Sequence, residues 1–368
     1  MVGMFATAVL ALTAMCGFLA ALLVVADRTV NNYGTCKITI NDDKEIETTG
    51  GQSLLSALGG EKIFIPSACG GRGSCGLCKL QVHSGAPQIL PTEEPHLTDD
   101  EIKENVRLSC QLKVREDMEI EIPEELFSIQ EFQARVTDIE DLTADIKRLE
   151  LTLLDPETIS FTPGKYIQLQ APAYGKNPDP VYRAYSLASD PRKQDRVEII
   201  VRLVPDGICT TWVFEILEQN DNVIFNGPYG DFQLNYDSDR EMIFIAGGSG
   251  MAPFCSILDD MKHRQIDRRT NYFFGAKTEG DLFYLDRMKE YEKELANFHF
   301  VPALSEPAPE DNWDGETGLI TDVVGSHYDD CSDKEAYLCG SPGMIDACIK
   351  VLTDRGLQED RIFYDKFA

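Results

Sequence analysis

Basic residues are scarce in this sequence. Its 368 residues include 34 Lys and Arg against 62 Asp and Glu, so the formal net charge is −28. Proteins that bind nucleic acid draw much of their affinity from basic side chains that contact phosphates. The acidic balance therefore argues against nucleic acid as a partner, while the length is enough for two or three domains with separate cores.

Charge is missing altogether from one segment. Residues 2–26 carry none, and a transmembrane helix needs about 20 apolar residues. A cleaved signal peptide would begin with basic residues, but no Lys or Arg precedes Asp27. Because Arg28 follows the apolar run, the positive-inside rule places the later domains in the cytoplasm. The sequence predicts a single-pass transmembrane anchor over residues 1–27.

Regularly paired cysteines are missing too, although the chain has 11 cysteines. Most occur singly, which argues against a disulfide framework. Only Cys75 and Cys78 have the Cys-x-x-Cys spacing, whereas structural zinc sites usually supply two such pairs, so zinc stays the less favoured alternative. A Rieske centre would need Cys-x-His pairs, which neither His83 nor His96 forms.

Four of the cysteines do suit an iron–sulfur cluster. Three lie in the segment 66–78 together with four glycines, and the fourth follows a predicted short helix. Glycine permits positive φ angles and lets backbone N–H groups approach the sulfurs of a cluster. We therefore predict that a [2Fe–2S] cluster is bound by Cys69, Cys75, Cys78 and Cys110.

A ferredoxin domain is expected over residues 36–125. A capping box at Thr98–Glu101 predicts a short helix ahead of Cys110. Alternating polar and apolar residues predict strands that, with a further helix at 53–58, form a β-grasp fold; the strands are expected at residues 36–41, 44–48, 78–82 and 111–122.

The spacing of the loop cysteines carries a resemblance. Five residues separate Cys69 from Cys75, one more than in plant-type ferredoxins. The loop resembles that of vertebrate-type ferredoxins and, more closely, that of the F subunits of Na+-translocating NADH:quinone oxidoreductases.

An antiparallel β-barrel is expected over residues 130–235, where regularly spaced strands alternate with turn signals. Two motifs stand out, Arg183-Ala184-Tyr185-Ser186 at a strand end and a Gly-Ile-Cys-Thr-Thr segment from Gly207 that opens an apolar helix. A helix N-terminus suits a pyrophosphate. Together the motifs resemble the flavin-binding domain of the ferredoxin–NADP+ reductase superfamily, and residues 227–232 would form the turn that ends its barrel.

This resemblance implies bound FAD. Arg183 would pair with the pyrophosphate, Tyr185 would lie against the isoalloxazine, and Ser186 would hydrogen-bond its redox edge. The terminal aromatic Phe367 is a candidate lid on the flavin, with a plain strand end as the alternative. The residues expected to cradle the phosphates are Gly207, Thr210 and Thr211.

A parallel α/β sheet is expected over residues 240–368. The fingerprint Gly-x-Gly-x-x-Gly is missing, but a Gly-Gly-Ser-Gly turn follows a buried strand and precedes a helix, which is the equivalent place. In the reductase superfamily, a segment similar to Cys339-Gly340-Ser341-Pro342 lies where nicotinamide meets flavin; otherwise Cys339 is a buried strand-end thiol. The residues expected to bind the nucleotide are Gly247, Gly248, Gly250, Cys339, Gly340 and Pro342.

Acidic residues dominate the segments after the second and third predicted strands of this sheet. Residues 277–281 and 305–311 hold one lysine among several acids, which favours NADH over NADPH. By the resemblance, the catalytic residues would be Tyr185, Ser186 and Cys339.

The order of the modules implies a direction of electron flow. The resemblance to the F-subunit family covers nearly the whole chain, although the stretch between Tyr166 and Arg183 is shorter than is common there. It implies hydride transfer from NADH to FAD and single electrons to the cluster. The electrons would then reach membrane subunits of a multisubunit redox complex, with quinone as the final acceptor and Na+ export by other subunits.

Two other functions compete with this one. An NADH-dependent reductase that feeds an oxygenase or another dedicated acceptor shares all three modules, but usually lacks the anchor and has the shorter cysteine spacing. An anchored electron carrier with vestigial flavin and nucleotide domains is opposed by the complete set of motifs.

Overall fold

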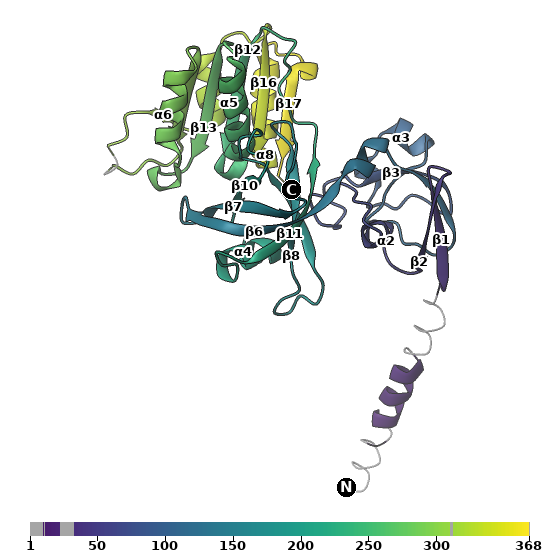
Figure 1. The fold of residues 1–368 in the computed structure, drawn as a ribbon. Helices are drawn as coiled ribbons and strands as arrows, with labels where there is room; N and C mark the ends of the chain where they lie inside the picture. Colours follow the sequence, from purple (N-terminus) through teal and green to yellow (C-terminus); the bar gives the residue numbers. More distant parts are fainter. Residues whose placement is uncertain (1–9, 11, 23–32, 310–311, 368) are drawn as a thin grey trace. The chain divides into compact units, whose positions relative to one another are not determined.

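The computed structural model describes residue 10 and residues 12–22, 33–309 and 312–367. Their contacts divide the chain into two compact units (Figure 1). The smaller unit holds the described residues up to Ile65 together with Gly71–Ser128, and the larger holds Pro66–Gly70 together with the described residues from Ile129 on.

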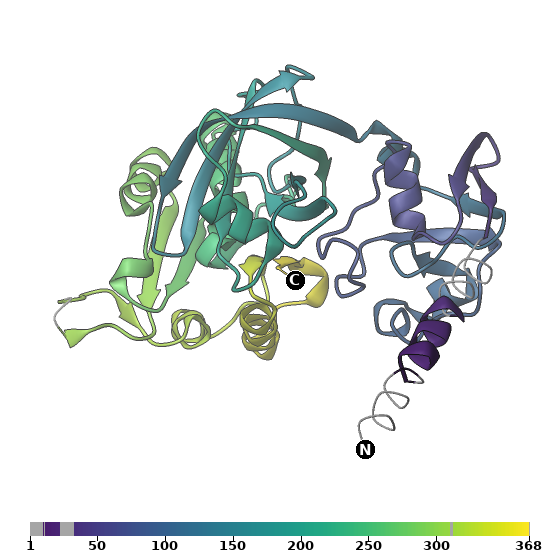
Figure 2. The same cartoon turned by 90° about the horizontal axis from the view of Figure 1, so that it is seen from below.

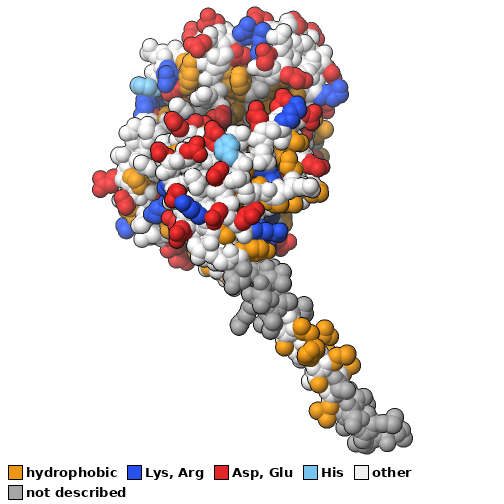
Figure 3. Space-filling view, turned by 90° about the vertical axis from the view of Figure 1, so that its right-hand side faces the viewer, with side chains coloured by type: hydrophobic (Ala, Val, Ile, Leu, Met, Phe, Trp, Pro, Cys, Tyr) orange, Lys and Arg blue, Asp and Glu red, His pale blue; other side chains and the backbone are white. Residues whose placement is uncertain are grey.

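The predicted anchor lies partly outside the described residues, which leave out residues 1–9, 11 and 23–27 of it. Residue 10 and residues 12–22 are helical, and their hydrophobic side chains, including Leu12 and Phe18, are exposed (Figure 3). Within the described ranges, no helix combines the length and the apolar character that crossing a membrane requires.

The smaller unit is built on a mixed sheet with strand order β2-β1-β5-β3-β4. β1 and β5 run parallel, and the other neighbours are antiparallel. Alternate residues such as Ile38 and Ile120 point into a core that Leu54 and Leu58 of helix α2 also enter. The strands are β1 (Thr35–Ile40), β2 (Lys44–Thr49), β3 (Lys79–Ser84), β4 (Val106–Leu108) and β5 (Met118–Glu121).

Short helices connect these strands. Ser53 caps α2, and Thr98 and Glu101 form the predicted capping box of α3. The helices are α2 (Leu54–Gly60), η1 (Glu94–His96), α3 (Asp99–Lys103) and η2 (Glu124–Ser128).

The expected strand over residues 111–122 is wrong in length and position. Only β5 forms, and it lies in the middle of the sheet instead of closing it. Leu112 and Val114 are buried, which accounts for the alternation. Their backbone groups instead bond the start of α2 and the residues just before it, with Leu54 N donating to Leu112 O over 2.8 Å and Val114 N to Gln52 O over 3.0 Å.

The larger unit begins with the predicted antiparallel barrel. Its strand order is β10-β7-β6-β11-β8-β9, and a single bridge between Leu187 and Ile199 joins the two ends. Helix α4 (Ile208–Glu215) contributes Cys209, Trp212 and Val213 to the barrel core. The strands are β6 (Gln130–Asp141), β7 (Ile146–Asp155), β8 (Tyr166–Ala171), β9 (Val181–Ser186), β10 (Arg196–Arg202) and β11 (Asn222–Tyr229).

The expectation of a turn over residues 227–232 places the start of the turn too early in the chain. Gly227, Pro228 and Tyr229 belong to β11, where the register with β8 shifts between Asn226 and Tyr229. The bulge absorbs the Gly-Pro pair without reversing the chain, because a β-bulge accommodates residues that do not fit the regular ladder.

A parallel sheet completes the larger unit, with strand order β15-β14-β13-β12-β16-β17. One face packs on α5 and α6 and the other on α7 and α8 (Figure 1). The last strand ends the chain at the edge of the sheet (yellow in Figure 2). The strands are β12 (Glu241–Gly247), β13 (Thr270–Ala276), β14 (Phe298–Leu304), β15 (Glu316–Thr317), β16 (Lys334–Gly340) and β17 (Ile362–Lys366).

Two helices of this sheet begin directly after turns that carry predicted nucleotide-binding residues. α5 starts directly after the glycine turn, and α8 starts at Pro342 with Ser341 as its N-cap. The helices are η3 (Gly248–Gly250), α5 (Met251–Arg264), η4 (Glu279–Asp281), α6 (Leu285–Glu294), α7 (Ile320–His327), α8 (Pro342–Asp354) and η6 (Glu359–Arg361).

Candidate functional site

The cysteine segment 66–78 contains no helix or strand. Its four glycines have positive φ angles of 64°, 86°, 77° and 70°, which confirms the expectation that glycine is needed there for backbone conformation. Cys69 and Cys78 are buried, whereas Cys75 and Cys110 are partly exposed. The positive-φ glycines are Gly70, Gly71, Gly73 and Gly76.

Two of the predicted cluster ligands lie in contact. The Cys78 and Cys110 thiols are hydrogen-bonded, and that bond together with burial raises the pKa of Cys78. Gln111 Nε2 also donates to Cys110 Sγ over 3.4 Å. By its contacts Cys69 belongs to the larger unit and the other three cysteines to the smaller one. No group of three or more His, Cys, Asp or Glu side chains within the described residues is placed to hold a metal ion.

The donor chemistry of these residues fits an iron–sulfur cluster. Among the described cysteines no disulfide forms, and cysteine thiolates are the usual ligands of such clusters. An added Cβ at Gly76 would lie 3.0 Å from His96 Nδ1, so the loop backbone packs closely against its surroundings.

A buried ion pair holds the segment that leads to Cys110. Arg107 and Glu93 are both 0% exposed and meet at 2.6 Å. Glu93 also accepts the backbone N–H groups of Leu90 and Leu108. Burial alone would raise the pKa of Glu93, but Arg107 and these N–H groups hold it below its ordinary value. Sequence analysis missed this pair, because nothing local marks the two residues as partners.

The two predicted FAD motifs meet on the barrel. Strand β9 carries Arg183, Tyr185 and Ser186, and α4 packs against it with Gly207 as its N-cap. Glycine is needed at the cap, because an added Cβ would lie 2.5 Å from Thr210 Oγ1. The Gly207 cap makes no side-chain hydrogen bond, so N–H groups of the first turn of α4 are left to a ligand.

The expected phosphate residues differ in what they already bind. Thr210 is buried, and its hydroxyl accepts from Val204 N over 3.2 Å, which fixes the turn before α4. Thr211 is half-buried. Arg183 is partly buried, and its Nη1 donates to Tyr182 O over 2.7 Å.

The glycine turn of the parallel sheet lies directly against the Cys-Gly-x-Pro segment. An added Cβ at Gly250 would lie 2.3 Å from Cys339 O, and one at Gly340 would lie 3.5 Å from Gly247 O. Pro342 is the first residue of α8. The structure therefore brings together residues that lie about ninety positions apart and that sequence analysis assigned to one nucleotide site.

Asp365, which sequence analysis did not identify, lies between two predicted catalytic residues. It is the register partner of Cys339 across β16 and β17, and its Oδ2 accepts a hydrogen bond from Ser186 Oγ over 3.3 Å. Burial raises the pKa of Asp365, and the Ser186 bond partly offsets this. Burial and the charge of Asp365 raise the pKa of the Cys339 thiol well above its ordinary value, so it stays protonated.

The candidate lid Phe367 follows directly. Its backbone N donates to Gly340 O over 2.9 Å, and its ring packs against the core between the barrel and the sheet. This hydrogen bond therefore places Phe367 beside the Cys-Gly-x-Pro segment.

Arg202 is a second residue that sequence analysis missed. It ends strand β10, and its Nη1 lies 3.3 Å from the position of an added Cβ at Gly248. Its guanidinium is more than half exposed and pairs with Asp145 at 2.9 Å. The arginine supplies positive charge beside the glycine turn, which suits a nucleotide phosphate.

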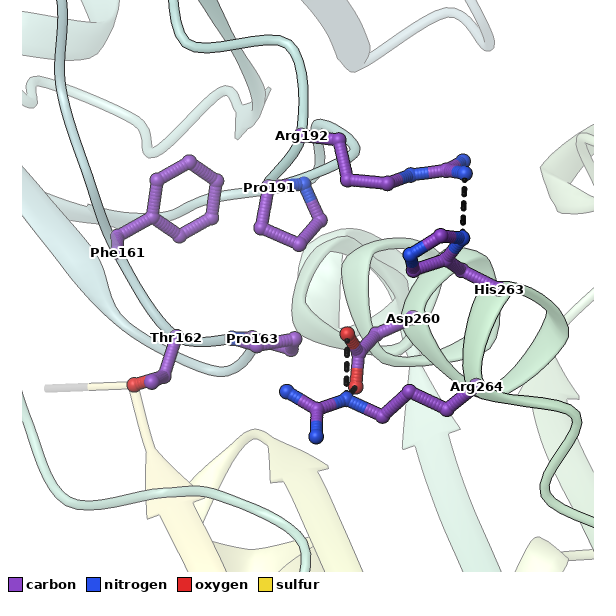
Figure 4. A pocket seen from close by; sticks show the side chains of 8 residues that line it. All are labelled: Phe161, Thr162, Pro163, Pro191, Arg192, Asp260, His263 and Arg264. Atoms are coloured by element: carbon purple, nitrogen blue, oxygen red, sulfur yellow. Dashed lines mark hydrogen bonds and ion pairs between the residues drawn. The ribbon is translucent and has the colours of Figure 1, made fainter.

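A separate pocket of about 380 Å³ lies elsewhere in the larger unit. Its apolar wall holds Phe161, Pro163 and Pro191 (Figure 4). The charged groups that line it pair with one another or with neighbours, Arg264 with Asp260 at 2.8 Å and Arg192 with Asp190. None of the predicted site residues lines this pocket.

Comparisons with known protein families match three segments. Residues 34–115 match the 2Fe-2S iron-sulfur cluster binding domain, residues 133–234 the oxidoreductase FAD-binding domain, and residues 244–350 the oxidoreductase NAD-binding domain.

Relatives match over nearly the full length. The F subunit of the Na(+)-translocating NADH-quinone reductase of Neisseria gonorrhoeae is 36% identical over 408 aligned positions, which cover 99% of this chain and 98% of that protein. Its counterpart in Idiomarina loihiensis is 37% identical, and the alignment covers 100% of this chain and 98% of that protein. Both alignments are at least 40 positions longer than this chain, so both relatives hold residues that it lacks.

Two solved structures are similar to this chain over most of its length. The cytochrome P450 reductase GcoB of Amycolatopsis is 30% identical, with a TM-score of 0.72 over 90% of this chain and 99% of that one. The ferredoxin reductase of carbazole 1,9a-dioxygenase is 24% identical, with a TM-score of 0.69 over 91% of this chain and 99% of that one. This second similarity concerns the fold alone.

Proposed function

Because the chain belongs to the family of the F subunits of Na(+)-translocating NADH-quinone reductases, we propose that it is the component through which NADH electrons enter such a complex. The observation that carries this is the full-length match together with 2Fe-2S, FAD-binding and NAD-binding domains in one chain. Bound FAD supplies two-electron chemistry with hydride donors and one-electron chemistry with iron–sulfur clusters, and neither NADH nor a cluster can do both.

The residues of the FAD and NADH sites would have different roles in binding. The N–H groups of α4 and the Arg183 guanidinium would bind the FAD pyrophosphate, and Tyr185 would orient the isoalloxazine. Gly247, Gly248 and Gly250 would let the NADH phosphates approach the backbone. Gly340 and Pro342 shape the turn that follows Cys339, and Phe367 would cover the flavin.

The catalytic residues would act by position and by holding protons. Ser186 Oγ keeps its proton directed at Asp365 Oδ2, and the protonated Cys339 thiol fills the space next to that carboxyl without a charge of its own. This arrangement would exclude water from the place where nicotinamide meets flavin.

The cluster site and the domain boundaries are part of the same proposal. Cys69, Cys75, Cys78 and Cys110 would ligate the [2Fe–2S] cluster. Residues 36–125 would form the ferredoxin domain, 130–235 the FAD-binding barrel and 240–368 the NADH-binding domain.

Residues 1–27 would anchor the chain in the inner membrane by a single span, with the other domains in the cytoplasm. The exposed apolar side chains of residues 12–22 and the lack of charge in residues 2–26 support this. The partners would be membrane subunits of the complex, with quinone as the indirect acceptor and Na+ export coupled to its reduction. Sodium carbonate washing should leave the full-length chain in the membrane fraction, and its release would contradict the anchor.

The order of electron transfer is tested with Cys75→Ala in the full-length chain. NADH should still bleach the flavin of this variant at the wild-type rate, because hydride transfer does not involve the cluster. Reduction of the downstream acceptor should fall at least 100-fold. Loss of flavin bleaching as well, or an unchanged rate of acceptor reduction, would contradict the proposed path.

A reductase that feeds an oxygenase is the second candidate, favoured by the match to the P450 reductase GcoB over 99% of that chain. Purification in mild detergent separates the two functions. Co-purifying membrane subunits and NADH-dependent quinone reduction would support the first, whereas turnover only with an added oxygenase would support the second.

A further inference from the structure

The side chain of Gln111 lies beside one of the predicted cluster ligands. Its Nε2 donates a hydrogen bond to Cys110 Sγ over 3.4 Å. The backbone of Gln111 is fixed as well, because its N donates to Leu108 O over 2.9 Å. Cys110 is partly exposed, so the amide occupies one side of a sulfur that solvent reaches from elsewhere.

Thr92 sets the direction of this amide. Its hydroxyl donates to Gln111 Oε1 over 3.2 Å, so the amide oxygen is engaged by Thr92 while the amide nitrogen faces the sulfur. A cysteine thiolate carries no proton, so an N–H group can hydrogen-bond it and a carbonyl oxygen cannot. The amide therefore has the orientation that a ligand thiolate at Cys110 requires.

The segments that carry Thr92 and Gln111 are held together at the buried ion pair. Glu93, next to Thr92, accepts the N–H of Leu108 over 3.0 Å, and the carbonyl of Leu108 in turn accepts from Gln111. The cysteine loop leaves room for the amide, because an added Cβ at Gly73 would lie 2.6 Å from Gln111 Nε2. Three parts of the smaller unit thus fix one donor beside Cys110.

We propose that Gln111 raises the reduction potential of the [2Fe–2S] cluster by donating an N–H···S hydrogen bond to Cys110, and that Thr92 is the positioning residue for this donor. This inference rests on the proposed cluster site. An electron that enters the cluster adds negative charge to its sulfur ligands, and hydrogen bonds to these sulfurs help to set the potential. Because a hydrogen bond strengthens as its acceptor becomes more negative, the bond from Gln111 stabilises the reduced state more than the oxidised state. It therefore favours passage of an electron from the flavin to the cluster.

A redox titration of the full-length holoprotein, followed by electron paramagnetic resonance of the reduced cluster, tests the role of Gln111. Gln111→Leu removes the donor and should lower the equilibrium constant for reduction of the cluster about tenfold, which is about 59 mV for a one-electron couple. The potential of the flavin, measured in the same titration, should not change. Exchange into D2O should shift the Fe–S stretching frequencies in the resonance Raman spectrum less in this variant than in the wild type, because one exchangeable N–H···S proton is missing.

The role of Thr92 is tested by a double-mutant cycle. Thr92→Val keeps the volume of the side chain and removes the hydroxyl that orients the amide. It should lower the equilibrium constant for reduction of the cluster about threefold, since the donor is present but no longer held in one orientation. In the Gln111→Leu background the same change should alter this constant less than about 1.5-fold, because the group that Thr92 orients is gone.

Two further variants make the test specific. Gln81→Leu removes another side-chain amide of the same unit, which donates to Glu104 O over 2.9 Å, and should leave the cluster potential unchanged. Gln111→Glu keeps the shape of the side chain but replaces the donor by a negative acceptor, and should lower the potential at least as far as Gln111→Leu does. If Gln111→Leu does not retain its cluster, Gln111→Met takes its place.

The inference fails if the Gln111 variants keep the wild-type cluster potential, or if Thr92→Val has the same effect in both backgrounds. Wild-type protein that contains no acid-labile sulfide would instead overturn the proposed cluster site, which separates the two failures.

Discussion

Glycine gathers in two segments of this chain, and one glycine from each, Gly71 and Gly250, is needed for a different physical reason. In the cysteine loop, Gly71 has φ of +86°, while an added Cβ would meet nothing closer than 3.8 Å. In the nucleotide turn, Gly250 has φ of −61°, which any residue adopts, but an added Cβ would lie 2.3 Å from Cys339 O. At Gly71, glycine is needed for the backbone conformation, and at Gly250 it is needed for space.

The two segments also differ in the ion pairs that support them. Three residues before Cys110, Arg107 pairs with Glu93, and both are fully buried. Near the start of β16, the strand that contains Cys339, Glu335 pairs with Arg268 at 2.8 Å, and 11% of the Arg268 side chain is exposed. A buried pair that loses one partner leaves a charge in a low-dielectric environment, so the fully buried pair should be the more sensitive.

The largest expected effect tests that difference. Glu93→Gln should destabilise the ferredoxin unit by about 3–5 kcal/mol, since it leaves the Arg107 charge buried and unpaired. Both arginines also donate to two backbone carbonyls, Arg107 to Pro87 O and Gln88 O, and Arg268 to Asn235 O and Arg240 O. Glu335→Gln should cost less, because the Arg268 side chain also reaches water. Denaturant titration followed by cluster absorbance for the first variant and flavin fluorescence for the second measures each unit separately.

The matched control is Asp354→Asn, which breaks the exposed pair with Lys350 on α8 and should cost under about 0.5 kcal/mol. Equal losses for Glu93→Gln and Glu335→Gln would remove the distinction between the two pairs.

The steric argument is tested next by Gly250→Ala. The added methyl group must displace the backbone at Cys339, which should cost about 1–3 kcal/mol and lower kcat/KM for NADH about tenfold or more. Gly343→Ala is the control, because an added Cβ at that position meets nothing within 4 Å. Wild-type kinetics in the Gly250 variant would show that the turn has room after all.

The conformational argument predicts a smaller effect at Gly71. Gly71→Ala should destabilise the ferredoxin unit by about 1–2 kcal/mol, since a left-handed backbone is costly for residues with a Cβ. Gly71→Asn should cost less than alanine, because asparagine tolerates that conformation better. At position 250 the order should reverse, with asparagine worse than alanine; the same order at both positions would contradict the comparison.

The smallest effect concerns pH and Asp365, next to Cys339. Its pKa is raised in the folded protein, so its contribution to stability is complete below its ordinary unfolded pKa and is lost as pH rises through the folded value. Asp365→Asn should remove this loss, so the difference in Tm between variant and wild type should grow in favour of the variant from pH 4 to pH 7. A constant difference over that range would show that Asp365 does not titrate abnormally.

Local patterns in the sequence were sufficient for much of the fold. The capping box of Thr98 and Glu101, the helix that starts after Gly207 and the strand that leads into Gly247 each depend on a few consecutive residues. The positive φ angles of the loop glycines were expected for the same reason. The motifs also predicted the three cofactors and their order along the chain, which is a [2Fe–2S] cluster, then FAD, then NADH.

Those local patterns could not predict features that depend on pairing between distant segments. Leu112 and Val114 alternate as a strand would, yet their backbone bonds the segment before α2, since hydrogen-bond partners are set by packing and not by periodicity. Asp365 on β17 accepts a hydrogen bond from Ser186 on β9, a residue 179 positions away in the chain, and no local pattern marks the two as partners. The type of a residue indicates which chemistry it can perform, but only the folded chain determines which groups lie close enough to interact.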